Sequence, residues 1–336
     1  MASLRWFSSE YHDLNGTAVA VLPEPPTSLQ FSQLVHISRP VLIQGVEMSS
    51  TRLWDNHYLA AAMGKTDISV AVTPNGRADA VTQGSDGKLY FAEPGVEKMP
   101  MSEFLSRLSG GTTILKLGAD DSDVYYLQSQ NGNIFSSRFY EGASDISEFE
   151  ALRADIPSEI SWCSEALGKS PDAVNLWIGD RKSVTSIHSD PYENIYHVVR
   201  GSKHFTLLPP TEGWCVKERM YPHGRWTRMI PTAPLTLVHS PDVPPIRWAS
   251  VIDPDIRGNL PPEAHPIGIT VNAGETLYLP PGWWHHVRQA DDTIALNWWY
   301  DMEMRGISWV LLSFLRGESN ALPDNETTSS EQVEDA

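Results

Sequence analysis

The chain has 336 residues, 41% of them hydrophobic and 12 of them tryptophan, a composition that can build a sizeable core and excludes a disordered chain. Its formal net charge is −17 at pH 7. An acidic surface repels phosphate backbones, which argues against nucleic acid as a direct partner and favours a basic protein or peptide, although acidity can also serve solubility alone.

The cysteine content predicts a reducing compartment. There are two cysteines, Cys163 and Cys215, and neither has the spacing of a zinc site or of a disulfide framework. The N-terminus lacks the apolar core of a signal peptide, and no apolar run approaches the roughly 20 residues that a membrane span needs. We therefore expect a cytoplasmic or nuclear protein without a membrane anchor.

Residues 1–170 combine helical and strand patterns, and we expect them to form an N-terminal α/β region that packs on the core. A helix is predicted at 102–108 with Ser102 as its N-cap, and a second helical segment at 145–167, broken near Pro157 and ended by Gly168. The predicted strands are rich in β-branched residues and lie at 40–45, 67–73, 112–117 and 124–127.

From Ala173 onward the pattern changes to short strands separated by turns. The predicted strands are 173–179, 183–188, 194–201, 203–210, 268–274, 275–282, 285–289 and 293–300. The step Arg200–Gly201–Ser202–Lys203 is typical of a tight hairpin. Such repetition predicts a mainly β protein with flanking helices, whose core at 171–301 is a sandwich or barrel.

Three further segments are predicted around this core. A long proline-rich insertion at 211–267 has little periodicity, and loops of that length are usually functional or wrap the surface. Residues 302–317 indicate a C-terminal amphipathic helix. Residues 318–336 are polar and acidic and predict a disordered tail.

A candidate metal site begins at His188 and Asp190. In an extended strand these two side chains project to the same face, because side chains alternate with period two. A third ligand would come from His285 or His286, and only one of these adjacent residues can point inward. Two imidazoles and one carboxylate on one side of a metal form the facial triad of non-haem iron(II) oxygenases.

Taken alone, the His-x-Asp spacing is weak evidence for a metal site, since a His and an Asp two residues apart are common in solvated loops. The context strengthens it, because the motif closes one predicted strand and the distant histidines follow another.

The strings VTSIHSDPYENIYHVVRGSKHFTLLPP, AGETLYLPPGWWHHV and ALNWWYDME resemble the JmjC-domain hydroxylases. The strings SVAVTPNGRADAV and WCSEALGKSPDAVNLWIG are similar to the subfamily of lysyl hydroxylases that act on developmentally regulated GTP-binding proteins. The resemblance extends from about residue 40 to about residue 315. It implies a double-stranded β-helix, the jelly-roll core of cupins.

The resemblance also implies a set of site residues. It selects His285, with His188 and Asp190, as the ligands of Fe(II). It implies that 2-oxoglutarate binds as co-substrate with O2. The residues that it assigns to 2-oxoglutarate are Lys203 as ion-pair partner of the far carboxylate, Thr185 and Tyr126 as hydrogen-bonding hydroxyls, and Asn194 and Asn297 near the chelating end. Gln128 matches a position that faces the substrate.

The activity implied by the resemblance is C3 hydroxylation of a lysine side chain in a GTP-binding protein, coupled to conversion of 2-oxoglutarate to succinate. Asp301 and Glu303 are candidate carboxylates for that lysine, and Asp301 is equally suited to cap the following helix. Members of this family often form homodimers, and the apolar C-terminal helix is predicted to be either core or dimer interface.

Three other functions remain open at this stage. The same ligands could bind zinc and activate water, which would make a metallopeptidase that acts on histone tails. The chain could be a β-barrel binding module without turnover. It could also be a JmjC oxygenase with another substrate, as a histone methyl-lysine demethylase or an asparaginyl hydroxylase, because specificity depends on loops. The absence of zinc-binding cysteine modules in the sequence favours a small hydroxylase.

Overall fold

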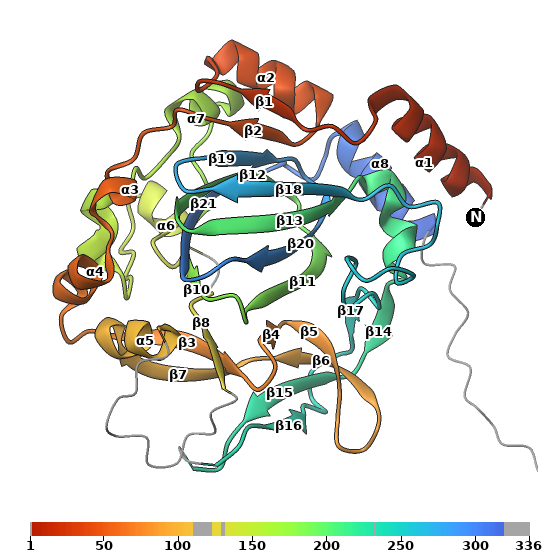
Figure 1. The fold of residues 1–336 in the computed structure, drawn as a ribbon. Coiled ribbons are helices and arrows are strands. Elements are labelled where there is room, and N and C mark those ends of the chain that lie inside the picture. The colour runs from red at the N-terminus through yellow and green to blue at the C-terminus, as the bar shows by residue number, and fades with distance from the viewer. Residues whose placement is uncertain (1, 110–122, 129–131, 231–232, 319–336) are drawn as a thin grey trace, which may run out of the picture.

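Two facing β-sheets form the centre of the molecule (Figure 1). A computed structural model describes residues 2–109, 123–128, 132–230 and 233–318. The strand predicted at 112–117 and the tail predicted beyond residue 318 lie outside the described residues.

Among the described residues the larger sheet has seven strands and the smaller has five. The larger sheet is ordered β1 (Ala20–Leu22), β2 (Val41–Ile43), β19 (Thr276–Leu279), β12 (Tyr192–Arg200), β21 (Thr293–Asp301), β10 (Ala173–Gly179) and β9 (Phe135–Ser136). The smaller sheet is ordered β18 (Ile267–Asn272), β13 (Ser202–Leu208), β20 (Trp284–Gln289), β11 (Val184–Ser189) and β4 (Arg77–Ala78). All eight strands predicted after residue 173 are present, four in each sheet, which confirms the mainly β, cupin-like jelly-roll class.

In the described part of the chain, three smaller sheets lie beside this core, below and to the right in Figure 1. They are β7 (Gly95–Pro100), β3 (Asp67–Thr73) and β8 (Val124–Tyr126); β16 (Thr236–His239), β15 (His223–Thr227), β6 (Leu89–Glu93) and β5 (Ala80–Gln83); and β14 (Arg219–Tyr221) with β17 (Ile246–Trp248).

Helices lie over the outer side of the larger sheet, at the right of the core, and on the sheet of β3, β7 and β8 (Figure 1). The α-helices are α1 (Ala2–Asn15), α2 (Ser28–Ile37), α3 (Ser49–Leu53), α4 (Asn56–Met63), α5 (Met101–Leu108), α6 (Ser137–Tyr140), α7 (Ser161–Leu167) and α8 (Ile307–Glu318). The 3₁₀ helices in the described residues are η1 (Glu150–Asp155) and η2 (Pro210–Val216). None of the helices among the described residues has the length and apolar character needed to cross a membrane.

Strand β21 shows why the core strands have nearly continuous apolar sequences. Leu296 and Trp298 point outward into the cluster that packs under the helices. Ala295 and Trp299 point inward, into the cluster between the two sheets. Because both faces are buried, period-two alternation of polar and apolar residues is lost, and the strand is apolar except where the site needs a polar group.

The step at Gly201 is not a hairpin, which corrects the prediction for 200–203. Strand β12 pairs with β19 and β21, whereas β13 pairs with β18 and β20, so the chain passes from one sheet to the other at this glycine. Gly201 has φ +75°, and a Cβ there would lie 2.5 Å from Oγ1 of Thr293. Only glycine fits this turn.

The C-terminal helix begins later than predicted. Residues 302–306 are not helical, because Glu303 and Met304 have φ of 64° and 32°, outside the right-handed helical region. The 211–267 insertion is more regular than its sequence suggested, since it contains η2 and β14 to β17. Its strands pair with one another and with β6, which aperiodic strands of three to five residues do not reveal.

One helix prediction in the N-terminal region needs correction at its N-cap, and a second is confirmed in its break near Pro157 and its end. Helix α5 starts at Met101, its N-cap is Pro100, and no side chain caps it, so Ser102 is not the N-cap. The segment predicted as helical at 145–167 consists of η1 and then α7, which ends at Gly168 with φ +67° as predicted.

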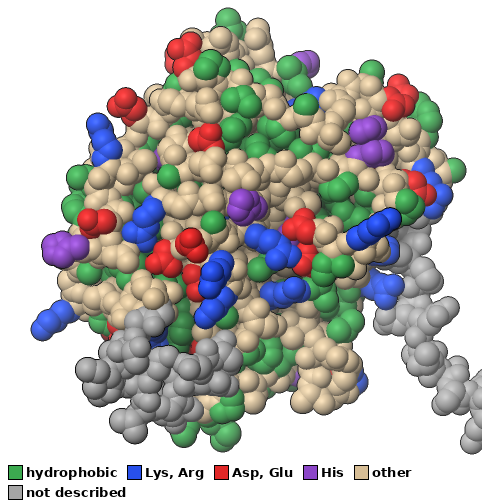
Figure 2. Space-filling model, viewed as in Figure 1, with side chains coloured by type: hydrophobic (Ala, Val, Ile, Leu, Met, Phe, Trp, Pro, Cys, Tyr) green, Lys and Arg blue, Asp and Glu red, His purple; other side chains and the backbone are tan. Residues whose placement is uncertain are grey.

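Acidic and basic side chains are intermixed on the face shown in Figure 2. The net charge of −17 is therefore not gathered into one acidic patch on that face.

Candidate metal centre and its cavity

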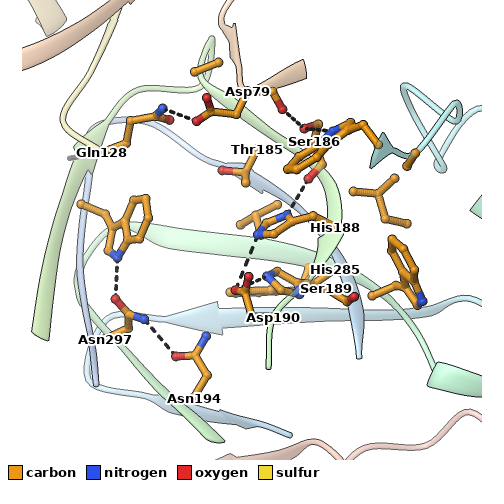
Figure 3. A pocket seen from close by; sticks show the side chains of 18 of the residues that line it. Asp79, Gln128, Thr185, Ser186, His188, Ser189, Asp190, Asn194, His285 and Asn297 are labelled. Atoms are coloured by element: carbon orange, nitrogen blue, oxygen red, sulfur yellow. Dashed lines mark hydrogen bonds and ion pairs between the residues drawn. The ribbon is translucent and has the colours of Figure 1, made fainter. Parts of the chain in front are cut away.

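The smaller sheet brings the three predicted metal ligands together. His188 lies on β11 and Asp190 follows its last residue, while His285 lies on the neighbouring strand β20. His188 and His285 are register partners, and Asp190 accepts a backbone hydrogen bond from Gly282 through its carbonyl oxygen, at 2.9 Å. The strand pairing and this loop contact hold the three side chains on one side of the sheet (Figure 3).

The ligand atoms of these three residues lie within 4.8 Å of one another. Nε2 of His188 and Nε2 of His285 are each 3.7 Å from Oδ2 of Asp190. Each imidazole donates from Nδ1 to a backbone carbonyl two residues earlier, His188 to Ser186 at 2.8 Å and His285 to Trp283 at 3.0 Å. These bonds fix the tautomer and leave both Nε2 atoms free to bind a metal.

The electrostatics of the cluster suit a cation. Burial raises the pKa of the Asp190 carboxyl, but the two histidines outweigh it and hold this pKa below its usual range. Burial, and then His188, lower the pKa of His285 to about 4. At neutral pH, Asp190 is ionised and His285 is neutral, which are the forms that ligate a metal.

His286 does not belong to this cluster. It faces the other side of β20, beside Thr206 in the register and 3.7 Å from Asp255. The ambiguity between the adjacent histidines is thereby resolved by which face of the strand each occupies.

Thr185 faces the same cavity because β11 contains a bulge. Thr185 pairs with Val287 and His188 with His285, so three residues on β11 span the distance of two on β20. The extra residue shifts the alternation, and Thr185 and His188 both line the cavity although they are three residues apart.

Lys203 is 1% exposed and donates from Nζ to the Tyr126 hydroxyl at 3.2 Å. Tyr126 is hydrogen-bonded in turn with Thr185, so the three residues form one cluster. Burial lowers the pKa of Lys203 to about 7. Among the described residues no carboxylate forms an ion pair with this ammonium. A buried ammonium without an anion is costly, and a bound carboxylate would stabilise it.

A chain of amides lies on the opposite wall. Asn297 donates from Nδ2 to Oδ1 of Asn194 at 3.1 Å, and Oδ1 of Asn297 accepts from the Trp177 indole at 2.8 Å (Figure 3). Both asparagines line the cavity, as does Trp177, which the sequence analysis did not single out.

The cavity around the triad has a volume of about 520 Å³. Gln128 lines it and donates from Nε2 to Oδ2 of Asp79 at 3.0 Å. Asp301 and Glu303 are not among the described residues that line it. Glu303 pairs with Lys169 at 3.1 Å and with Arg305, and the Asp301 carbonyl accepts from Lys169. The geometry gives no support to these two as substrate carboxylates.

Asp79 and Trp248 are cavity residues that the sequence analysis missed. Trp248 lies parallel to the His188 ring, with centroids 5.9 Å apart. The string SVAVTPNGRADAV, which carries the family resemblance, contains Asp79, so the sequence did hold a signal that could have pointed to this residue. Trp248 lies in the aperiodic insertion, where no local pattern marks it.

The donor set fits an iron(II) site, since two imidazole nitrogens and one carboxylate converge from one side and leave the cavity side open. The buried Lys203 cluster fits a dicarboxylate beside it. The residues of this chain alone supply the groups for both the metal and the dicarboxylate.

Comparison with known proteins gives a consistent result. A family model described as Cupin-like domain matches residues 26–306. The chain is 36% identical over 292 residues to the human bifunctional peptidase and (3S)-lysyl hydroxylase JMJD7, covering 85% of each protein. It is 37% identical over 320 residues to lysine-specific demethylase JMJ32 of Arabidopsis thaliana, covering 90% of this chain and 86% of that protein. It is 33% identical to JmjC domain-containing protein E of Dictyostelium discoideum, covering 87% and 86%.

Proposed function

The chain belongs to the cupin-like JmjC-domain family, and on that premise we propose that it is an iron(II)- and 2-oxoglutarate-dependent hydroxylase of a lysine side chain in a protein substrate. The observation that carries the proposal is the convergence of His188, Asp190 and His285 in a cavity that is also lined by Tyr126, the hydrogen-bond partner of the buried Lys203.

In this proposal the three converging residues hold the metal. His188 and His285 bind through Nε2, because their Nδ1 atoms are engaged by backbone carbonyls. Asp190 supplies the anionic ligand. Iron(II) with 2-oxoglutarate and O2 supplies the chemistry when bound, the oxidation of an unactivated C–H bond coupled to decarboxylation of 2-oxoglutarate to succinate.

Lys203 holds the far carboxylate of 2-oxoglutarate, with the hydroxyls of Tyr126 and Thr185 as hydrogen-bonding partners. An ammonium that is 1% exposed forms a strong charge-assisted pair, because little water competes for it. Asn194 and Asn297 orient the other end, and the buried indole of Trp177 fixes the amide of Asn297.

The human relative's name specifies lysyl hydroxylation, whereas that of the Arabidopsis relative specifies demethylation. The choice of lysine hydroxylation at C3, in a GTP-binding protein, is therefore the finer part of the proposal. We further propose that the protein acts as a homodimer through α8.

The test is mass spectrometry of a lysine-containing peptide from a developmentally regulated GTP-binding protein after incubation with iron(II), 2-oxoglutarate and air. We expect a gain of one oxygen on the lysine, absent in His188→Ala. Consumption of 2-oxoglutarate without oxidation of the peptide would point to another substrate. Cleavage of the peptide with 2-oxoglutarate unused would favour a metallopeptidase.

A further inference from the structure

The end of the cavity away from Asp190 is formed by Asp79 (Figure 3). This residue alone joins β4, which belongs to the jelly roll, to β5 of the four-stranded sheet. Its backbone has φ +50°, in the left-handed region. Its carbonyl accepts from the Ser186 hydroxyl at 2.6 Å, which ties this corner to β11. Positive φ is uncommon outside glycine, and Asp is among the residue types that tolerate it.

The Asp79 carboxylate has unused hydrogen-bonding capacity. Oδ2 accepts from Gln128, a neutral amide, and in the described part of the chain Oδ1 has no hydrogen-bond partner. Burial, and then Glu93, raise the pKa of Asp79 to about 6. The carboxylate is therefore mostly ionised at neutral pH, and although His188 and His223 lower its pKa through space, its direct hydrogen-bond partner is a neutral amide. A half-buried carboxylate in that state favours a cation.

Two other carboxylates besides Asp190 line the cavity in the described residues, and both already have cationic partners. Glu93 pairs with His223 at 3.2 Å and accepts from Arg225 Nε at 3.0 Å. Glu218 is buried and pairs with Arg247 at 2.5 Å and with Arg316 at 2.7 Å. Asp79 differs from both, because its direct partner is uncharged.

Aromatic side chains line the cavity with Asp79 and the triad. Phe91 and Trp248 lie with ring centroids 4.7 Å apart, and Trp248 is stacked parallel to His188. Such a wall suits a polymethylene chain, which gains apolar contact while its charged end reaches a carboxylate. The aromatic faces also favour a nearby cation.

We propose that Asp79 is the residue that binds the ammonium group of the substrate side chain, whose methylene groups lie along Phe91 and Trp248 toward the metal ligands. The inference rests on the proposed function and deepens it, because it names the group that selects a primary ammonium. A primary ammonium donates hydrogen bonds to Asp79, whereas a trimethylammonium has none to donate. The site therefore prefers unmodified lysine.

The test uses three labelled peptides that differ at one position, with lysine, norleucine or trimethyl-lysine. Their affinities are measured by fluorescence anisotropy with the protein carrying Mn(II) and 2-oxoglutarate, so that no turnover occurs. The variant is Asp79→Asn, which removes the charge and keeps a residue type that tolerates positive φ. Asp86→Asn is the matched control, because Asp86 is an exposed carboxylate seven residues along the chain and outside the cavity.

Wild type is expected to bind the lysine peptide about tenfold or more tightly than the other two, as a charge-assisted hydrogen bond predicts. Asp79→Asn should bind all three within about twofold, while Asp86→Asn keeps the preference. Preference retained by Asp79→Asn, or absent from wild type, would overturn the inference.

Hydroxylation of the lysine peptide, measured separately by mass spectrometry, decides the proposed function. Wild type that prefers lysine but adds no oxygen to it refutes the hydroxylase and leaves the role of Asp79 standing. Wild type and Asp79→Asn that hydroxylate lysine with equal KM refute the role of Asp79 and leave the hydroxylase standing.

Discussion

His188 and His285 are register partners across β11 and β20, with ring centroids 4.2 Å apart and rings inclined at 52°. Adjacent antiparallel strands place such partners close together, so the two imidazoles are arranged by the sheet itself and not by a flexible loop. Asp190 then needs only to lie one residue beyond the end of β11 to complete the cluster. A rigid sheet is a favourable support for a metal site.

Metal binding should depend on Asp190 and not on His286. Wild type is expected to gain thermal stability on addition of Mn(II), because a ligand at 100 times its Kd stabilises the folded state by about 2.7 kcal/mol. Asp190→Asn should lose most of this gain, whereas His286→Gln, on the opposite face of β20, should keep it. Differential scanning fluorimetry with increasing Mn(II) measures the shift. An unchanged shift in Asp190→Asn would contradict the assignment.

Lys203 should lower the folding stability of the protein without 2-oxoglutarate, because its ammonium is buried without an anion. Its pKa is lowered to about 7 by burial, so the folded state binds fewer protons than the unfolded state between about pH 7 and pH 10.5. The loss of folding stability caused by burying the Lys203 ammonium is fully present below pH 7 and disappears as the pH rises to 10.5. The free energy of unfolding of Lys203→Met should therefore be roughly 1–4 kcal/mol higher than that of wild type at pH 7.

Urea denaturation at pH 7 and pH 10 measures this difference, which should shrink at the higher pH. The exposed Lys88 supplies the control, and Lys88→Met should change neither value. Lys203→Met should also lose the thermal stabilisation that 2-oxoglutarate gives wild type. A destabilised Lys203→Met protein would show that Lys203 is not an unpaired charge.

Binding of 2-oxoglutarate should be accompanied by proton uptake. With a pKa of about 7, Lys203 is mostly neutral at pH 8, and a bound dianion would raise this pKa and draw in a proton. Calorimetric titration of Mn(II)-loaded protein in buffers of different ionisation enthalpy measures the uptake. We expect close to one proton at pH 8 and almost none at pH 6, while Lys203→Arg should show none at either pH. Equal uptake at both pH values would contradict the role of Lys203.

Glu218 should hold α8 against the core. Its side chain is 2% exposed and pairs with Arg247 of β17 and Arg316 of α8. Glu218→Gln leaves two arginines without their anion and should cost about 3 kcal/mol of stability. The exposed pair of Glu303 and Arg305 is a useful contrast, because Arg305→Gln should leave the melting temperature unchanged. Equal changes in melting temperature for Glu218→Gln and Arg305→Gln would show that burial does not strengthen the ion pairs of Glu218.

The outer face of α8 should form a dimer interface. Val310, Leu311 and Phe314 are 56%, 47% and 49% exposed and do not belong to the core, whereas Leu315 on the same helix is 5% exposed and does. Leu311→Asp should therefore keep the wild-type melting temperature and halve the mass measured by light scattering after size exclusion. Wild type that is already monomeric would contradict the proposal of a dimer.

The sequence by itself determined the strand content of the core and the identity of the metal-ligand candidates. Both depend on local rules. Apolar strands ended by turn residues can be recognised one at a time, and the spacing of His188 and Asp190 places them on one face of any extended chain. The resemblance then selected His285, and the register of β20 explains that selection through strand alternation.

Only the tertiary structure decided the shape of the cavity and the residues at its far end. Asp79 reaches it from a corner between two sheets, and Trp248 from an aperiodic insertion whose strands pair with one another and with β6. Asp301 and Glu303 are absent from the described lining of the cavity for the same reason. Proximity in sequence to Asn297 does not determine on which side of the sheet a residue after β21 lies, because long-range pairing and positive backbone φ set that direction.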